Sequence, residues 1–112
     1  MNKNDLKAFT GRLHELRHEI QRLSDTTADD RRPVQLDQAA VGRLSRMDAM
    51  QGQAMHLETE RRRTLERRRI DAALQRIEED EFGNCVSCGD AIESKRLQHD
   101  PSVPTCLNCA KG

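Results

Sequence analysis

Aromatic residues are scarce in this chain: its 112 residues include two Phe, no Tyr and no Trp. So few aromatic side chains cannot fill a broad globular core, which favours an elongated shape. Charge of one sign is not in excess, because 19 Lys and Arg balance 19 Asp and Glu. A DNA-reading domain normally has a basic balance and aromatic residues for stacking, so we do not expect sequence-specific DNA binding.

Long apolar runs are also missing. No apolar stretch approaches the roughly 20 residues that span a bilayer, and no charged-then-apolar leader opens the chain. We therefore expect a cytoplasmic protein that does not insert into a membrane. The sequence also offers no nucleophile paired with a general base, so an enzyme is not expected.

Apolar residues recur at coiled-coil spacing near the N-terminus. They are separated alternately by three and four residues, at Leu6, Phe9, Leu13, Leu16, Ile20 and Leu23. This spacing predicts a first helix over about residues 3–24, packed along a coiled-coil seam. The polar stretch that follows runs into Pro33, which suits the first turn of a second helix, so we place a turn at about residues 25–35.

The second helix is predicted to be much longer, over about residues 36–82. No Pro interrupts it, and Gly83 can adopt the left-handed conformation past its end. We expect the first helix to pack against the N-terminal half of the second, which offers Leu36, Ala40, Leu44, Met47, Met50, Ala54 and Leu57. In the other half, arginines at positions 61–63 and 67–69 point all round the helix, which predicts a segment surrounded by solvent.

Four cysteines dominate the C-terminal segment. They form two Cys-x-x-Cys clips, Cys85 with Cys88 and Cys106 with Cys109, separated by 17 residues. This spacing is typical of a site in which four thiolates hold one structural Zn²⁺ ion. We therefore predict a mainly α protein: an antiparallel helical hairpin over residues 1–82 leading into a small C4-type zinc finger over residues 83–112.

The cysteines have two other possible uses. A disulfide framework requires an oxidising compartment, whereas the sequence shows no secretory leader. A redox Cys-x-x-Cys pair normally lies in a βαβ unit, and two clips are one more than such a pair requires. Zinc is the better explanation of the spacing.

The C-terminal segment also resembles a known family. Residues 77–92 read IEEDEFGNCVSCGDAI, and Arg96, Leu97, Pro101 and the second clip follow. This combination closely resembles the DksA/TraR C4-type zinc-finger family. With the preceding helix, the resemblance covers the chain from about Val34 onward. It implies a coiled-coil finger on a zinc-stabilised base.

The resemblance also implies a function. The best-known members bind bacterial RNA polymerase, insert the finger into its secondary channel, and alter transcription initiation together with the alarmone ppGpp. We therefore expect a transcription regulator, with RNA polymerase as its partner and ppGpp as a further component of the complex.

In that family, activity depends on an Asp-x-x-Asp-x-Ala pattern at the tip of the finger. The nearest match here is the segment from Val34 to Ala39, where Asp37 and Ala39 fit and Val34 stands in place of the first Asp. Asp37 and Ala39 are thus the candidate partner-binding residues. The alternative role for Asp37 is to cap the second helix.

A second function class fits the same pattern. The chain could be a zinc-stabilised coiled-coil adaptor or self-associating module, in which the C-terminal half of the second helix pairs with another chain. The residues that would form that interface are Leu65, Ile70, Leu74 and Ile77. We expect a monomer rather than a dimer.

Overall fold

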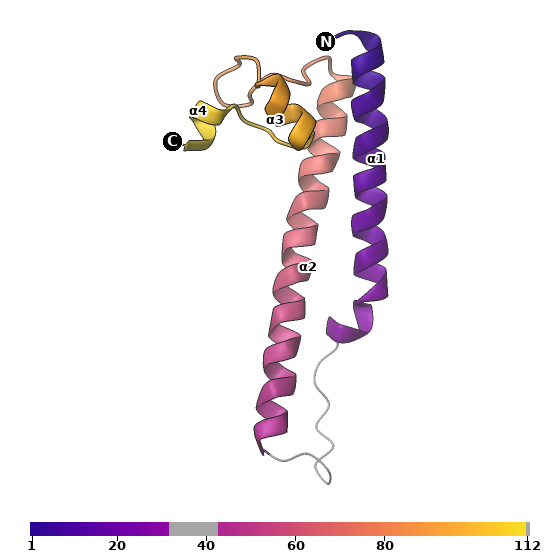
Figure 1. Cartoon of the computed structure of the whole chain (residues 1–112), viewed down its shortest axis with the longest axis vertical. Helices are drawn as coiled ribbons and strands as arrows, with labels where there is room; N and C mark the ends of the chain where they lie inside the picture. The colour runs from indigo at the N-terminus through magenta and orange to yellow at the C-terminus, as the bar shows by residue number, and fades with distance from the viewer. Residues whose placement is uncertain (32–42, 112) are drawn as a thin grey trace.

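Two long helices run side by side in opposite directions, and a small C-terminal module packs against one end of the pair (Figure 1). The computed structural model describes residues 1–31 and 43–111. Its elements are α1 (Lys3–Thr26), the 3-10 helix η1 (Ala28–Arg31), α2 (Arg43–Glu78), α3 (Ser94–His99) and α4 (Leu107–Lys111). The longest dimension is 63 Å. The mainly helical class, the elongated shape and the antiparallel hairpin are as predicted.

Helix α1 begins and packs as its sequence predicts. The side chain of Asn2 caps the first turn by accepting a hydrogen bond of 2.8 Å from the backbone N–H of Asp5. Leu13 is fully buried, and the seam residues on either side of it pack against the core. The helix ends at Thr26, two residues beyond the predicted end.

The register of the hairpin differs from the expected one. Helix α1 packs against the C-terminal half of α2: Leu13 and Ile70 are both fully buried, and Arg17 forms an ion pair of 3.2 Å with Asp71. The rings of Phe9 and Phe82 lie 5.3 Å apart, beyond the end of α2. The expectation that α1 would pair with residues 36–57 was therefore wrong.

The physical reason is the position of the apolar core. Ile70 and Ala73 of α2 belong to one cluster with residues of the C-terminal module, and α1 gains most burial by packing beside it. The N-terminal half of α2 has no such support, since Met47, Met50, Met55 and Leu57 are 49–72% exposed. Leu36, Ala40 and the predicted start of the second helix lie outside the described residues.

The arginine-rich part of α2 is not surrounded by solvent either. The side chains of Arg63 and Arg67 are only 19% and 24% exposed, because they lie on the face of α2 toward α1 and η1. Ion pairs at helical spacing also form within α2, from Glu58 to Arg62, from Glu60 to Arg63 and from Glu66 to Arg69.

Helix α2 ends earlier than expected. It stops at Glu78, and Asp80 takes the left-handed conformation with a φ of 60°. The N–H of Glu81 donates to the carbonyl of Arg76 at 2.9 Å, and the N–H of Asp80 donates to that of Ile77 at 3.3 Å. These two bonds form a Schellman motif, with Asp in the position that Gly usually occupies. Gly83 also has a positive φ, but it belongs to the next turn.

Truncation of one leucine tests the register. Leu13→Ala should lower the free energy of unfolding by about 2–5 kcal/mol, because it leaves a cavity between α1 and α2. Leu57→Ala makes the same chemical change at a side chain that is 49% exposed and should cost well under half as much. Urea unfolding followed by circular dichroism measures both. Equal losses would contradict the observed register.

Candidate metal centre

The first clip lies in a short loop of the finger that an antiparallel bridge closes. Asn84 and Ala91 form an antiparallel bridge, the N–H of Cys85 donates to Asp90 O at 2.8 Å, and that of Ile92 donates to Gly83 O at 2.8 Å. The chain turns inside this loop, where Gly89 has a φ of 80° and its N–H donates to Cys85 O at 2.9 Å. A left-handed glycine is suited to this turn because it has no Cβ to clash.

The second clip lies at the start of α4. The N–H of Ala110 donates to Cys106 O at 3.0 Å, so Cys109 is carried on the first turn of the helix. The two clips are tied together by the N–H of Val86, which donates to Pro104 O at 3.0 Å. Backbone hydrogen bonds therefore hold both cysteine pairs beside each other.

The four sulfur atoms converge on one point. Their Sγ atoms all lie within 4.8 Å of one another, and those of Cys88 and Cys106 are 3.7 Å apart. A tetrahedral site with Zn–S bonds of about 2.3 Å has sulfur–sulfur distances of about 3.8 Å, which matches. A disulfide would require about 2.05 Å, and all four cysteines are free. The donor set thus fits a closed, structural zinc site.

The environment of the thiols is uneven without a metal. The pKa of Cys85 is lowered to about 6, chiefly by a hydrogen bond from the backbone of Cys106. The pKa of Cys109 is raised to about 12, chiefly by hydrogen bonds with the side chains of Cys106 and Cys85. Four adjacent thiols cannot all ionise unless a cation balances them, so the cluster favours a bound metal.

The finger is docked on α2 by a buried loop. Ser102 is fully buried, and its hydroxyl lies 2.7 Å from an oxygen of Asp100 and 3.1 Å from one of Glu66, so that its single proton can be donated to either carboxylate. Arg69 forms ion pairs of 3.5 Å with both of these carboxylates. Arg12 of α1 donates to the backbone carbonyls of Gln98 and His99 at the end of α3. The metal centre is therefore connected to both long helices.

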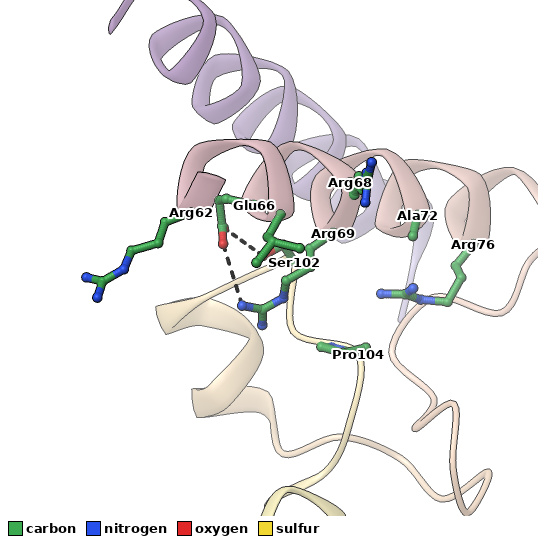
Figure 2. A pocket seen from close by; sticks show the side chains of 9 residues that line it. Arg62, Glu66, Arg68, Arg69, Ala72, Arg76, Ser102 and Pro104 are labelled. Atoms are coloured by element: carbon green, nitrogen blue, oxygen red, sulfur yellow. Dashed lines mark hydrogen bonds and ion pairs between the residues drawn. The ribbon is translucent and has the colours of Figure 1, made fainter. Parts of the chain in front are cut away.

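A cationic groove of about 570 Å³ lies between α2 and this loop. In Figure 2 the guanidinium groups of Arg69 and Arg76 point toward the finger. The groove is lined by Arg62, Leu65, Glu66, Arg68, Arg69, Ala72, Arg76, Ser102 and Pro104. The Nε atom of Arg76 is buried with no hydrogen-bond partner among the described residues, and desolvation lowers the pKa of this side chain. The sequence pattern did not reveal this groove, because its two sides are about 30 residues apart.

The predicted site residues thus have different outcomes. The structure brings Cys85, Cys88, Cys106 and Cys109 together, as expected. The candidate tip residues Asp37 and Ala39 lie outside the described residues. The sequence pattern did not predict that Glu60 forms ion pairs with Arg31, Arg63 and Arg67, because arginines in this part of the helix were expected to be exposed to solvent.

The helical hairpin and the sulfur cluster define a zinc-finger protein with a coiled-coil arm. Residues 80–112 match the family described as prokaryotic dksA/traR C4-type zinc finger. The C-terminal segment is therefore a zinc finger of the DksA/TraR family, and the resemblance predicted from the sequence is confirmed.

Curated relatives match over the same part of the chain. The chain is 36% identical over 42 residues to the RNA polymerase-binding transcription factor DksA of Haemophilus influenzae, and the match covers 38% of this chain and 29% of that protein. The same protein from Escherichia coli K12 matches with 36% identity over 42 residues and 28% of its length. The match therefore spans less than a third of these relatives.

Solved structures match over nearly the whole chain. Transcription factor DksA2 from Pseudomonas aeruginosa superposes with a TM-score of 0.79 over 99% of this chain and 84% of that one, at 21% identity. The DnaK suppressor protein from Agrobacterium tumefaciens gives a TM-score of 0.56 over 99% and 93%, at 28% identity. These likenesses establish the fold of a helical hairpin on a small C-terminal base.

Loss of one sulfur ligand should destabilise more than the finger. The apolar core joins α1, α2 and the finger in one cluster, so Cys88→Ser should lower the melting temperature by about 10 °C, equivalent to about 2 kcal/mol. Ser87→Ala is the control, because it changes an exposed residue of the same clip. Thermal unfolding with and without a strong chelator measures the effect. Equal melting temperatures for the two variants, each unaffected by chelation, would contradict a structural metal.

Proposed function

We propose that this protein binds bacterial RNA polymerase and regulates transcription initiation, with its helical hairpin inserted into the secondary channel. The observation that carries the proposal is a DksA/TraR zinc finger at the base of a hairpin that shares the DksA2 fold over 99% of the chain. The curated relatives are named as RNA polymerase-binding transcription factors, and transcription factors of this kind are not enzymes.

The four cysteines would serve this function structurally. We propose that Cys85, Cys88, Cys106 and Cys109 are the ligands of one zinc ion. A shell of four thiolates leaves no open position for water or substrate, so the metal would stabilise the base of the hairpin without taking part in a reaction. Our domain division, a hairpin over residues 1–82 and a finger over residues 83–112, is part of the same proposal.

The shape of α2 suits a probe. Its 36 residues extend about 54 Å at 1.5 Å per residue, and its N-terminal part continues past the end of α1 (Figure 1). We propose that Asp37 and Ala39, which precede α2 in the sequence, contact the polymerase near its active centre. A carboxylate placed there could perturb the metal-containing active centre of the enzyme.

The cationic groove offers a place for ppGpp in the complex. Arg62, Arg68, Arg69 and Arg76 line it, and Glu66 is the one acidic residue among its described lining. Guanidinium groups bind phosphates through charge-assisted hydrogen bonds, and the Nε of Arg76, which has no partner in the described part of the chain, has a free donor. We propose that this groove contributes the protein's side of a ppGpp site.

Most of the interface proposed for a self-associating adaptor is covered within this chain, although Leu65 is 43% exposed. Ile70 is fully buried against α1 and Leu74 is partly buried in the same core, so neither is available to a second chain. We therefore propose a monomer. No helix among the described residues is long and apolar enough to cross a membrane. A polymerase-bound regulator would work in the cytoplasm.

Binding to core RNA polymerase tests the main proposal. The zinc-loaded protein should bind at micromolar concentration or tighter and be displaced by another secondary-channel factor. Asp37→Asn should reduce its effect on initiation about tenfold or more while leaving binding nearly unchanged, because it removes only the charge that is proposed to act on the active centre. Asp48→Asn is the matched control, since Asp48 is an exposed acid on α2. Absence of binding at these concentrations would overturn the proposal.

Arg76→Gln tests the ppGpp site. The variant keeps a polar side chain but removes the charge, and we expect the concentration of ppGpp that alters initiation to rise about tenfold. Arg61→Gln is the control, because Arg61 is exposed and pairs with Glu58 at 2.8 Å away from the groove. In vitro transcription with increasing ppGpp provides the measurement. An unchanged response in Arg76→Gln would exclude the groove.

A further inference from the structure

The contact between α1 and α2 changes character along its length. On α2, the residues that face α1 and η1 recur with alternating spacings of three and four, at Glu60, Arg63, Arg67, Ile70, Leu74 and Ile77. The half of this seam near the finger is apolar, whereas the half farther from the finger is charged. Such a polar section within a coiled coil is expected to affect register rather than bulk stability.

Glu60 is the centre of the charged section. Its Oε2 atom accepts a hydrogen bond of 2.9 Å from the hydroxyl of Ser24 and lies 3.3 Å from Arg31 and 3.6 Å from Arg63. Its Oε1 atom lies 3.5 Å from Arg67. The Glu60 side chain is 18% exposed, and those of the three arginines are 19–24% exposed, so the ion pairs are weakly screened.

The same arginines also bind the end of α1. Arg31 donates to Ser24 O at 3.1 Å and to Thr27 Oγ1 at 3.0 Å, and Arg63 donates to that same hydroxyl at 3.0 Å. Arg67 donates to the hydroxyl of Ser24 at 2.9 Å. The network therefore joins α1, η1 and α2 at a single point.

A shift of the helices along each other would break this network. It would place Glu60 and its arginines opposite Leu23 or Ile20 of α1, where a charged group has no partner. The apolar half of the seam can accept leucine against isoleucine in more than one register, so the charged half is the more selective part.

We propose that Glu60 is a positioning residue of this hairpin. Through Ser24 and Arg67 it fixes the register of α1 against α2, and through Arg31 it holds η1 against both helices, ahead of Asp37 in the sequence. The structural part of this inference stands alone; its consequence for polymerase rests on the proposed function.

Backbone dynamics measured by NMR on the full zinc-loaded chain test the structural part. In the wild type, amides of Ala28–Arg31 should show order parameters near those of α1, at about 0.85. In Glu60→Gln they should fall below about 0.6, because the neutral amide no longer holds three guanidinium groups. Amides of residues 6–16 should be unaffected.

Two further variants make the result specific. Glu58→Gln is the matched control, because Glu58 is a more exposed carboxylate on the same helix that pairs with Arg61 and Arg62. Arg31→Met should reproduce the effect of Glu60→Gln, and the double variant should be no more mobile than either single variant, since both act through one contact. Unchanged order parameters in both single variants would overturn the inference.

The functional part has its own readout. Glu60→Gln should weaken the effect on initiation about tenfold in an in vitro transcription assay and leave the metal content unchanged, because the four cysteines lie elsewhere. If the wild type does not bind polymerase, the proposed function fails while the NMR result still decides the structural inference. If the wild type binds and Glu60→Gln acts as well as wild type despite mobile Ala28–Arg31 amides, the positioning role in function is overturned.

Discussion

The convergence of four sulfur atoms is the constraint on which the rest of the structure depends. The finger has too few apolar residues to fold alone, since its buried apolar members are Ile92, Leu97, Pro101 and Val103 with two of the cysteines. Coordination of one zinc ion by all four thiolates, as we propose, would supply the missing stabilisation, as metal binding does in other small zinc modules. Once ordered, the finger presents its buried loop to α2, and Ile70 and Ala73 complete a core that also receives α1.

Because the apolar core lies beside the finger, the two ends of the helical hairpin are held together by different interactions. Near the finger, the helices are held by apolar contacts and by the Phe9–Phe82 ring pair. Farther away, the seam is held by Glu60 and its arginines. Beyond that point, the exposed methionines of α2 show that burial contributes little. Stability is thus concentrated at the base, and the free end of the arm is suited to contact a partner.

Much of this fold could be predicted from the sequence. The spacing from Leu6 to Leu23 predicted α1 to within two residues, because a coiled-coil seam produces a regular pattern. The Cys-x-x-Cys spacing predicted the metal centre, since two clips can supply a complete tetrahedral shell. Both signals are local in the chain, so neither depended on knowing the tertiary structure.

The register and the charged seam could not be predicted in the same way. Periodicity says which face of a helix is buried but not which partner covers it, and the apolar positions from Met47 to Leu57 offered a plausible but wrong partner for α1. Charged residues at the positions of Glu60, Arg63 and Arg67 were interpreted as solvent-exposed, although burial with partners from α1 and η1 satisfies them. The end of α2 was misplaced because Asp80, and not Gly83, is the left-handed residue that ends the helix, while the positive φ of Gly83 belongs to the next turn.

The most direct test of this account is X-ray absorption spectroscopy at the zinc edge on freshly purified, reduced protein, with the metal content measured in the same sample. The account predicts one zinc per chain and a first shell of four sulfur atoms at about 2.3 Å. A sample without zinc, or a shell in which nitrogen or oxygen replaces sulfur, would contradict it.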